Sequence, residues 1–323
     1  MRAAICTAYG PPEVVRLVAL PDPVPQQGEV LIRVRASTVA SADHRIRAMD
    51  FPVGFHLLGR LIFGIRAPRQ QILGTELSGV ILVTGEGVDG WQEGQEVVAM
   101  PGARMGAHAE LIVMKADGAM SPKPERLDFG QAAALSFGGT TALYFLRDRA
   151  DLQSGESVLV TGAGGAVGSA VIQIARAMGG QVTAIAGADK TEILQGLGFT
   201  DLIPPNAPPD GSRQWDVIVD CAGIVGLGHA RDWLAAKGRL CKVHASLPQM
   251  LGAMVLRLGQ GRRILCGAAP ERSVDLQTLA LMADEGDFLP LIGARMPMSQ
   301  IVEAHRLAAG GHKLGNTVIE MGR

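Results

Sequence analysis

The stretch that decides the fold is Ser157-Val158-Leu159-Val160-Thr161-Gly162-Ala163-Gly164-Gly165-Ala166-Val167-Gly168-Ser169. An apolar run stops at a cluster of glycines, and residues 170–175 continue with helical spacing. A strand, a tight loop and a helix N-terminus form the arrangement that binds a pyrophosphate, because glycines let the backbone turn sharply and approach the phosphates. Glycines also mark ordinary structural turns, so the surrounding chain has to decide between the two interpretations.

Strands and helices alternate from this loop onward. The predicted strands are Val158–Val160, Gln181–Ala186, Val217–Asp220, Arg239–His244, Arg263–Cys266 and Asn316–Met321, and the predicted helices are Ala170–Met178, Lys190–Leu197, Val274–Glu285 and Ser299–Ala309. Strands that alternate with helices predict right-handed crossovers and a parallel sheet covered on both faces. The expected fold class is therefore α/β, with a Rossmann-type doubly wound parallel sheet.

The residues before Asp128 are expected to be rich in β-structure. Short β-branched segments bounded by Gly or Pro occur at Arg2–Thr7, Val14–Leu20, Glu29–Ser37, Gly79–Thr84 and Gln95–Met100. Residues 43–69 differ, because apolar residues mix with arginines and Pro52 and Pro68 interrupt the segment. This segment is expected to be a helical or irregular excursion that lines a cleft, or else a surface elaboration.

Composition narrows the class of protein. The chain has 323 residues, enough for two domains, and it is 47% hydrophobic and 19% charged, which is a globular profile. A formal net charge of −1 does not favour binding to nucleic acid or to an anionic membrane. The start of the chain lacks a signal-peptide pattern and no apolar run is long enough to cross a bilayer, so a cytoplasmic location is expected.

The position of the glycine loop and the tyrosines exclude one class of nucleotide-binding enzyme. A short-chain reductase has its loop near the chain start and uses a Tyr-x-x-x-Lys pair. Here the loop is in mid-chain, and the two tyrosines, Tyr9 and Tyr144, both precede it without a lysine four residues later.

Motifs along nearly the whole chain carry a family resemblance. They are residues 9–14 (YGPPEV), 28–34 (GEVLIRV), 73–79 (LGTELSG), 94–97 (GQEV), 132–142 (AAALSFGGTTA), the glycine loop and 311–319 (GHKLGNTVI). With them the chain resembles the medium-chain dehydrogenase/reductase superfamily, and within it the zinc-independent quinone oxidoreductase branch, whose bacterial members are often labelled NAD(P)-dependent alcohol dehydrogenases. Ala163 in the first glycine position of the loop has that branch's form.

The resemblance implies a domain organisation. A GroES-like catalytic domain would span 1–127 and be rejoined by 268–323, and a Rossmann dinucleotide-binding domain would span 128–267. The strand Arg263–Cys266 would form the sheet edge, which commonly pairs across a two-fold axis in the superfamily, so a homodimer is expected. The apolar stretch Leu247–Leu258 would suit an interface or a substrate wall.

The resemblance also shows which positions of this chain correspond to the zinc ligands of related enzymes. Zinc alcohol dehydrogenases hold the metal with an early cysteine, a histidine in Gly-His-Glu and a later cysteine. The first position falls near Ala40 and the histidine position at Thr75, and the four-cysteine structural lobe has no counterpart. No metal site is expected, and hydride transfer without a Lewis acid favours electrophilic acceptors, which are quinones and α,β-unsaturated carbonyls.

The end of the second nucleotide-fold strand bears on the choice of cofactor. An NAD site places an acidic residue there to bind the ribose 2′-hydroxyl. In the family register this position is Gly187, which leaves room for a 2′-phosphate, and Lys190 would supply positive charge by resemblance to the branch's phosphate-binding lysine. NADPH is therefore expected. Asp189 keeps NADH open, because it would approximate the NAD acid if the strand ended two residues later.

The remaining cofactor contacts follow from the resemblance and from the rule that ligands bind at the carboxyl ends of parallel strands. With Lys190, the predicted cofactor-binding residues are Thr141, Gly162, Ala163, Gly165, Ala166, Val167, Gly168, Cys221, Ala222, Val243, His244, Gly267, Lys313 and Asn316. Cys221 and Cys266 are expected to be small apolar residues and not reactive thiols.

Catalytic candidates come from the loop that begins at Ala40. Quinone-reductase relatives often carry an asparagine and a tyrosine there, which fall at Ala40 and near Arg45. Arg45 would polarise a carbonyl oxygen, His44 would donate a proton near neutral pH, and Asp43 would orient either of them or pair with Arg47. A purely structural role stays open for each, and a quinone needs no protein acid, because the hydroquinone anion takes its proton from water.

Three hypotheses about function remain open. The first is NADPH-dependent reduction of a small-molecule quinone or enone. The second is an alcohol or carbonyl dehydrogenase that works without zinc. The third is a non-catalytic NADPH-binding redox sensor that acts through a partner protein.

Overall fold

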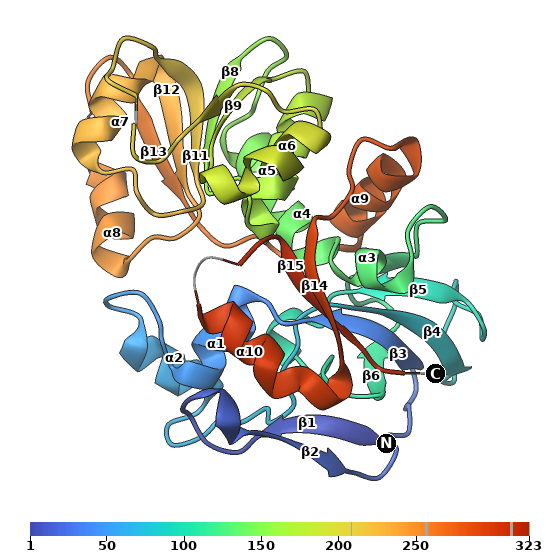
Figure 1. Ribbon diagram of the computed structural model, residues 1–323. Helices are drawn as coiled ribbons and strands as arrows, with labels where there is room; N and C mark the ends of the chain where they lie inside the picture. The colour runs from blue at the N-terminus through green and yellow to red at the C-terminus, as the bar shows by residue number, and fades with distance from the viewer. Residues whose placement is uncertain (208, 256–257, 311–312, 323) are drawn as a thin grey trace. The chain divides into compact units, whose positions relative to one another are not determined.

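The computed structural model describes residues 1–207, 209–255, 258–310 and 313–322, with only the backbone at 254 and 255. Gly311 and His312 of the tail motif, and part of the stretch Leu247–Leu258, lie outside this description. The chain divides into two compact units (Figure 1). Unit 1 comprises Met1–Phe51, Phe55–Phe137 and Glu271–Arg323, and unit 2 comprises Pro52–Gly54 and Gly138–Pro270.

Unit 2 contains a parallel sheet. In spatial order its strands are β10 (Leu202–Ile203), β9 (Gln181–Ile185), β8 (Ser157–Thr161), β11 (Trp215–Asp220), β12 (Leu234–Lys242) and β13 (Arg263–Cys266). All five pairings are parallel. The chain order reverses between β8 and β11, which is the doubly wound pattern that opens a ligand crevice at the strands' carboxyl ends. The Rossmann fold is confirmed, and β13 is the sheet edge as expected.

The helices of unit 2 alternate with these strands along the chain (Figure 1). They are α5 (Ala166–Ala177), α6 (Ala188–Gly196), α7 (Leu227–Trp233) and α8 (Leu247–Val255), and α4 (Ser136–Leu143) continues into a π-helical turn at Tyr144–Arg149. Buried apolar side chains, Trp215 and Trp233 among them, form the core against Leu159 and Leu240. Because α5 begins with small residues that give no apolar period, its start lies four residues before the predicted Ala170.

Among the predicted strands of unit 2, β12 differs most from its predicted bounds. The sequence placed a strand at Arg239–His244, whereas β12 spans Leu234–Lys242. The strand therefore ends at a lysine, and Val243 and His244 belong to the loop that follows it. Apolar residues on both sides of Lys242 extended the predicted pattern beyond the last ladder pair, which is Lys242 with Cys266.

Unit 1 is built on a seven-stranded, mostly antiparallel sheet and a separate hairpin. The sheet comprises β3 (Glu29–Thr38), β4 (Leu77–Thr84), β5 (Glu96–Ala99), β6 (Leu111–Lys115), β7 (Met120–Pro122), β14 (Ile292–Pro297) and β15 (Asn316–Glu320), and the hairpin comprises β1 (Arg2–Cys6) and β2 (Val15–Ala19). Three short 3-10 turns lie at Pro12–Val14, Gly102–Arg104 and Met298–Gln300. The sequence missed β6, β7 and β14, which are short or lack a clear apolar alternation. This is the expected GroES-like domain.

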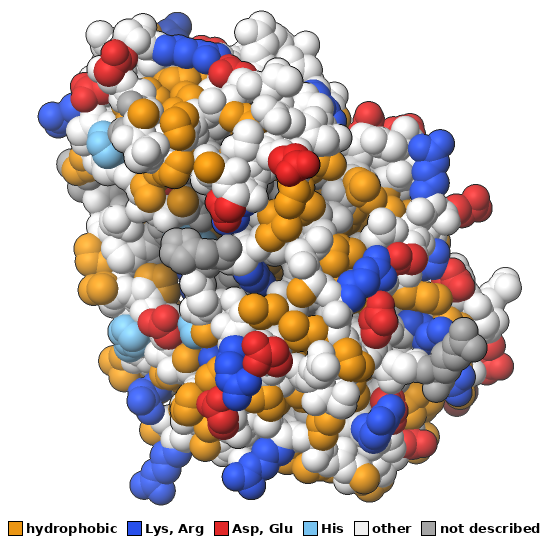
Figure 2. All heavy atoms as spheres, in the orientation of Figure 1, with side chains coloured by type: hydrophobic (Ala, Val, Ile, Leu, Met, Phe, Trp, Pro, Cys, Tyr) orange, Lys and Arg blue, Asp and Glu red, His pale blue; other side chains and the backbone are white. Residues whose placement is uncertain are grey.

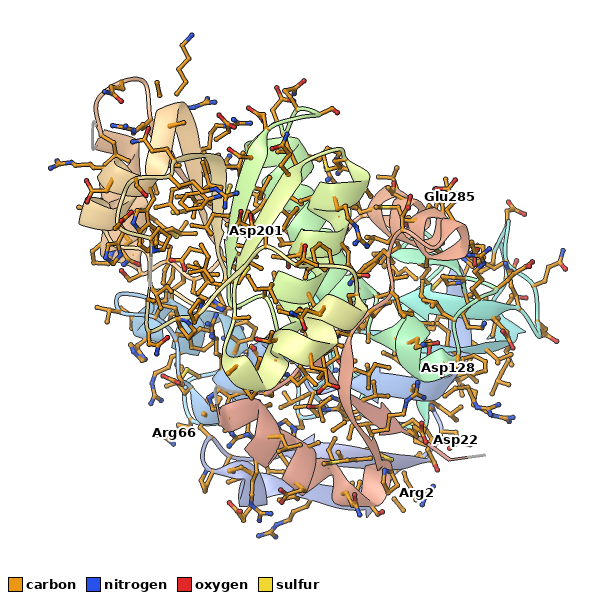
Figure 3. All side chains as sticks on the ribbon, turned by 45° about the horizontal axis from the view of Figure 1, so that its top comes forward. Arg2, Asp22, Arg66, Asp128, Asp201 and Glu285 are labelled. Atoms are coloured by element: carbon orange, nitrogen blue, oxygen red, sulfur yellow. The ribbon has the colours of Figure 1, made fainter. Side chains whose placement is uncertain are left out.

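Five α-helices accompany this sheet in the described part of unit 1. They are α1 (Ser41–Ala48), α2 (His56–Phe63), α3 (Phe129–Ala133), α9 (Ser273–Glu285) and α10 (Ile301–Ala309). The segment 43–69, which was expected to be helical or irregular, thus contains most of α1 and all of α2. Asp128 caps α3, since its Oδ1 accepts from Gln131 N at 2.8 Å while Oδ2 pairs with Arg295 at 2.6 Å (Figure 3). The segment Phe129–Ala133 belongs to unit 1, although the sequence assigned it to the nucleotide-binding domain.

The surface carries charges of both signs. Figure 2 shows Lys and Arg side chains interspersed with Asp and Glu over the visible face. In the described ranges, no helix has both the length and the apolar character needed to cross a membrane.

Candidate functional site

The glycine loop of unit 2 brings backbone unusually close to backbone. Gly162 has φ +66°, a conformation that L side chains rarely adopt, and a Cβ placed on Gly168 would lie 2.2 Å from Gly162 O. Gly165 is the N-cap of α5 and gives the helix no side-chain cap. The first N–H groups of α5, from Ala166 to Gly168, therefore have no side-chain partner from the cap, and N–H groups at a helix N-terminus suit a pyrophosphate oxygen.

Helix α4 lies against this loop within unit 2. A Cβ placed on Gly138 would be 2.7 Å from Ala166 O, so the two helices meet at close range. Thr141 lies one turn farther along α4 and is almost fully buried. Thr141 therefore belongs to the helix that packs against the start of α5.

The other predicted residues of unit 2 form a row along the carboxyl edge of the sheet. Cys221 follows β11, Val243 and His244 follow β12, and Gly267 follows β13, and all four are half-buried. Ala222 is exposed. Burial raises the pKa of the Cys221 and Cys266 thiols, which keeps both protonated at neutral pH. Neither thiol has the character of a nucleophile, in agreement with the prediction.

A buried ion pair that the sequence did not reveal holds this edge together. Lys242 Nζ donates to Asp220 Oδ2 at 2.9 Å and to Val225 O at 2.8 Å. The other carboxylate oxygen, Asp220 Oδ1, accepts from Thr161 Oγ1 at 2.7 Å. These side chains connect the ends of β8, β11 and β12, and because their polar atoms are hydrogen-bonded the buried charges are compensated. A lysine within the apolar run LCKV was the only signal in the sequence.

The residues that bear on cofactor choice lie at the start of α6. Gly187 is the N-cap at the end of β9, and a Cβ placed there would lie 2.5 Å from Asp189 Oδ1. The Lys190 side chain crosses the glycine loop, since its Cδ would lie 2.3 Å from a Cβ on Gly164. The Lys190 side chain is thus close to the glycine loop and half-buried, whereas Asp189 is exposed and lies beside the backbone of Gly187.

In unit 1, Asp43 is fully buried and its two carboxylate oxygens hold backbone. Oδ2 accepts from Ala40 N at 2.8 Å and Oδ1 accepts from Gly74 N at 2.8 Å. These bonds fix the start of α1 against the residues before β4. The predicted alternative of an Asp43–Arg47 pair is wrong, because Arg47 instead donates from Nη1 to Gly10 O and lies with Nη2 3.0 Å from His44 Nδ1.

His44 is placed between a cation and an acid. Arg47 can only donate, so His44 Nδ1 is the acceptor of that contact, and Nε2 lies 3.6 Å from Asp50 Oδ2. Burial, with Arg47 as a second cause, lowers the His44 pKa. The imidazole is therefore neutral at pH 7, which weakens its case as a general acid. Burial also lowers the pKa of Arg45, whose guanidinium still stays charged at neutral pH.

Glu76 is a titratable residue that the predictions did not single out. Its buried carboxylate accepts from Thr38 Oγ1 and, at 2.6 Å, from Phe137 N. Burial raises the pKa of Glu76 to about 7, and Asp43 adds to the rise while Lys313 opposes it. A carboxyl group with that pKa exchanges a proton near neutral pH. Its position directly after Gly74-Thr75 was the signal in the sequence.

The two C-terminal residues predicted to contact cofactor are engaged within unit 1. Lys313 Nζ donates to Val39 O at 3.0 Å, and burial lowers its pKa. Asn316 donates to Leu291 O from its backbone N at 2.8 Å and from Nδ2 at 3.0 Å. Asn316 therefore fixes the junction between β14 and β15.

The side chains present do not suit zinc. In the part of the chain that the structure describes, no three or more His, Cys, Asp or Glu residues gather where they could hold a metal ion. Asp43 and Glu76 are the acids beside Thr75, but their oxygens already accept from Gly74 N, Ala40 N, Thr38 and Phe137 N. Thr75 Oγ1 is buried without a hydrogen-bond partner among the described residues, and a neutral hydroxyl is a poor zinc ligand.

Comparisons with known proteins agree with this architecture. The profile of the family described as "Zinc-binding dehydrogenase" matches residues 187–319, and that described as "Alcohol dehydrogenase GroES-like domain" matches residues 26–125. The chain is 29% identical to the quinone oxidoreductase of Rattus norvegicus, over 99% of this chain and 97% of that protein.

Solved structures give the same picture. The quinone oxidoreductase from Coxiella burnetii superposes with a TM-score of 0.84 at 27% identity, covering 100% of this chain and 99% of that chain. A structure described as an NAD-dependent alcohol dehydrogenase superposes with a TM-score of 0.85 at 26% identity, covering 100% of both chains.

Proposed function

Because the chain belongs to the medium-chain dehydrogenase/reductase superfamily and is quinone oxidoreductase-like, we propose that it reduces a quinone or an α,β-unsaturated carbonyl with NADPH and without catalytic zinc. That the chain is an NAD(P)H-dependent oxidoreductase follows from its relatives. Three points are proposed: that the electron acceptor is a quinone or an α,β-unsaturated carbonyl, that the cofactor carries a 2′-phosphate, and that no catalytic zinc takes part.

The observation that carries the proposal is the contact between Gly168 and the Gly162 carbonyl, which leaves the uncapped start of α5 open to a dinucleotide pyrophosphate. The bound nicotinamide would supply the hydride. Ala166, Val167 and Gly168 would orient the cofactor through backbone N–H groups. The row from Gly162 to Gly267 along the sheet edge would shape the rest of its site.

The preference for NADPH rests on Lys190. Its side chain crosses the loop at Gly164, where a cation complements a 2′-phosphate, and Gly187 offers no carboxylate to repel one. Asp189 is the opposing feature. We expect Lys190→Gln to raise KM for NADPH about tenfold, with little effect on NADH, because a charge-assisted contact is lost. Asp189→Asn should leave NADPH use intact, and Arg231→Gln, at an exposed position of α7, is the charge-matched control. If the wild type prefers NADH and Asp189→Asn abolishes that preference, the cofactor is NADH and not NADPH.

Arg45 is the residue proposed to act on the acceptor. Its permanent positive charge would stabilise the oxyanion that forms when hydride reaches a quinone or enone, and water would then supply the proton. Arg45→Gln should lower kcat, with partial rescue in Arg45→Lys. Equal activity of wild type and Arg45→Gln would remove Arg45 from the site.

The decisive experiment follows NADPH oxidation with quinones, enals, saturated ketones and aldehydes, before and after dialysis against a chelator, with metal content measured in parallel. We expect turnover with quinones or enals that the chelator leaves unchanged. Chelator-sensitive oxidation of simple alcohols would overturn the proposal in favour of the alcohol dehydrogenase to which the chain is also similar. Tight NADPH binding without turnover of any acceptor would favour a redox sensor. A cytoplasmic location is part of the proposal and is tested by cell fractionation.

A further inference from the structure

A cavity of about 330 Å³ lies within unit 1, and its lining includes Ile46, the α1 residue that follows Arg45, but none of the predicted site residues. Its apolar lining includes Ile46 of α1, Phe63 at the end of α2, and Met105. Its polar lining comprises Arg69, Gln70 and Arg104. A volume of this size falls within the range of small-molecule sites, about 300–1,000 Å³, and an apolar lining with a few polar groups is typical of them.

The first wall of the cavity is held in place by specific contacts. Tyr9 Oη donates to Gly64 O at 2.7 Å, and Arg69 N donates to Phe63 O at 2.7 Å. Gly64 has φ +127°, and a Cβ there would lie 2.0 Å from Ala67 O. Only glycine allows this tight return of the chain after α2, so the turn that presents Arg69 is preformed.

The opposite wall is equally fixed. Ala103 N donates to Glu271 Oε1 at 3.0 Å, which holds the short helical turn Gly102–Arg104. Met105 follows with φ +53°, an unfavourable conformation for a residue with a side chain, and it is only 3% exposed. Residues held in this conformation are concentrated at ligand sites, because the surrounding structure must compensate their strain.

The charged side chains that line the cavity, Arg69 and Arg104, are both positive. Arg69 and Arg104 are exposed, and among the described residues neither guanidinium has an ion-pair partner. The carboxylate of Glu271, which accepts from the backbone N of Ala103, does not line the cavity. Two guanidiniums beside an apolar floor complement a molecule that is flat and apolar at one end and anionic at the other, since the guanidinium fork matches carboxylate and phosphate oxygens.

We propose that this cavity binds a small molecule with a planar apolar body and an oxyanion, with Arg69 and Arg104 on the oxyanion and Phe63 and Met105 against the body. The site lies wholly in unit 1 and needs no cofactor. Its existence is therefore independent of the proposed hydride transfer.

The test is calorimetric titration of the full chain, without NADPH, with 2-naphthoate, 2-naphthyl phosphate and the neutral 2-naphthalenemethanol. We expect the two anions to bind at least about tenfold more tightly than the alcohol, and their order distinguishes a carboxylate from a phosphate ligand. Arg69→Gln and Arg104→Gln should each weaken 2-naphthoate about tenfold and leave the alcohol unchanged, since both side chains are exposed and their loss does not disturb the fold.

Arg66→Gln is the matched control. Arg66 (labelled in Figure 3) is an exposed arginine of the same loop, and it is not among the residues that line the cavity. It should bind 2-naphthoate like wild type. The proposal is overturned if no anion binds at millimolar concentration, if the alcohol binds as tightly as 2-naphthoate, or if Arg66→Gln weakens binding as much as Arg69→Gln. NADPH turnover enters none of these outcomes, so a failure here is separate from a failure of the proposed function.

Discussion

At the scale of single residues, the carboxyl group of Glu76 in unit 1 has a strongly raised pKa. Its side chain is fully buried beneath Thr38 and the backbone of Phe137, and Lys313 supplies only a partial countercharge. Burial penalises the ionised form more than these hydrogen bonds favour it, and the pKa rises to about 7. Stability must therefore depend on pH near neutrality.

We predict that wild type loses stability relative to Glu76→Gln as pH rises. The unfolded carboxyl titrates at its ordinary pKa of 4.5, whereas the folded one holds its proton up to about 7. Between those values the folded state binds more protons, so stability falls with rising pH, by about 3 kcal/mol in total. Urea unfolding of both proteins at pH 4, 6 and 8 measures the difference. A difference that does not change with pH would show that Glu76 ionises normally in the folded chain.

At the scale of secondary-structure elements, the junction of β8 and α5 depends on the absence of a side chain at Gly168. Alanine ordinarily favours a helix over glycine by about 1 kcal/mol. At this position the added Cβ would meet Gly162 O at 2.2 Å, a backbone atom that cannot move aside without disturbing the loop. The steric cost therefore outweighs the gain in helix propensity.

We predict that Gly168→Ala lowers the thermal midpoint and abolishes NADPH binding. Gly228→Ala is the matched control, because Gly228 also lies in a helix, α7, and a Cβ there meets nothing within 4 Å. That substitution should be neutral or stabilising by up to about 1 kcal/mol. Calorimetry and NADPH fluorescence titration measure both effects. If Gly168→Ala bound NADPH as tightly as the wild type, the prediction would be wrong, because the loop would tolerate a larger separation between residue 168 and the Gly162 carbonyl.

At the scale of the whole molecule, β13 leaves a sheet edge in unit 2. It pairs with β12 on one side, and in the described residues its other side has no strand partner. An unpaired edge of this kind is a template for another strand, and a second copy of the same chain is the simplest one.

We predict that the protein is a homodimer joined through β13. Light scattering coupled to size-exclusion chromatography should give twice the chain mass, and Ile264→Pro should give the monomer, because proline removes a backbone donor and disrupts strand pairing. Leu281→Asn, at an exposed position of α9, is the control and should remain dimeric. A monomeric wild type at micromolar concentration would rule the dimer out.

The sequence by itself determined the place of the glycine loop and the order of β8, α5, β9, α6, β11, β12 and β13 in unit 2, but it missed β10, α7 and α8. Those features follow from local causes: apolar runs that alternate with helical periods, and glycines where the backbone must turn. It could not place Lys242 against Asp220, or Asp43 against Gly74 and Ala40, because such contacts join residues that are distant in the chain or that compete among several partners.

Only the tertiary structure decided which polar side chains are occupied by hydrogen bonds within the protein and which can still contact a ligand. The carboxylate of Asp43 is used on backbone N–H groups and His44 is held neutral by its surroundings, whereas Arg69 and Arg104 border a cavity without ion-pair partners in the described part of the chain. Burial and hydrogen bonding set these outcomes, and both depend on how distant segments pack. The sequence therefore determined the fold of the nucleotide-binding unit, and the packing of unit 1 decided the chemistry available to its side chains.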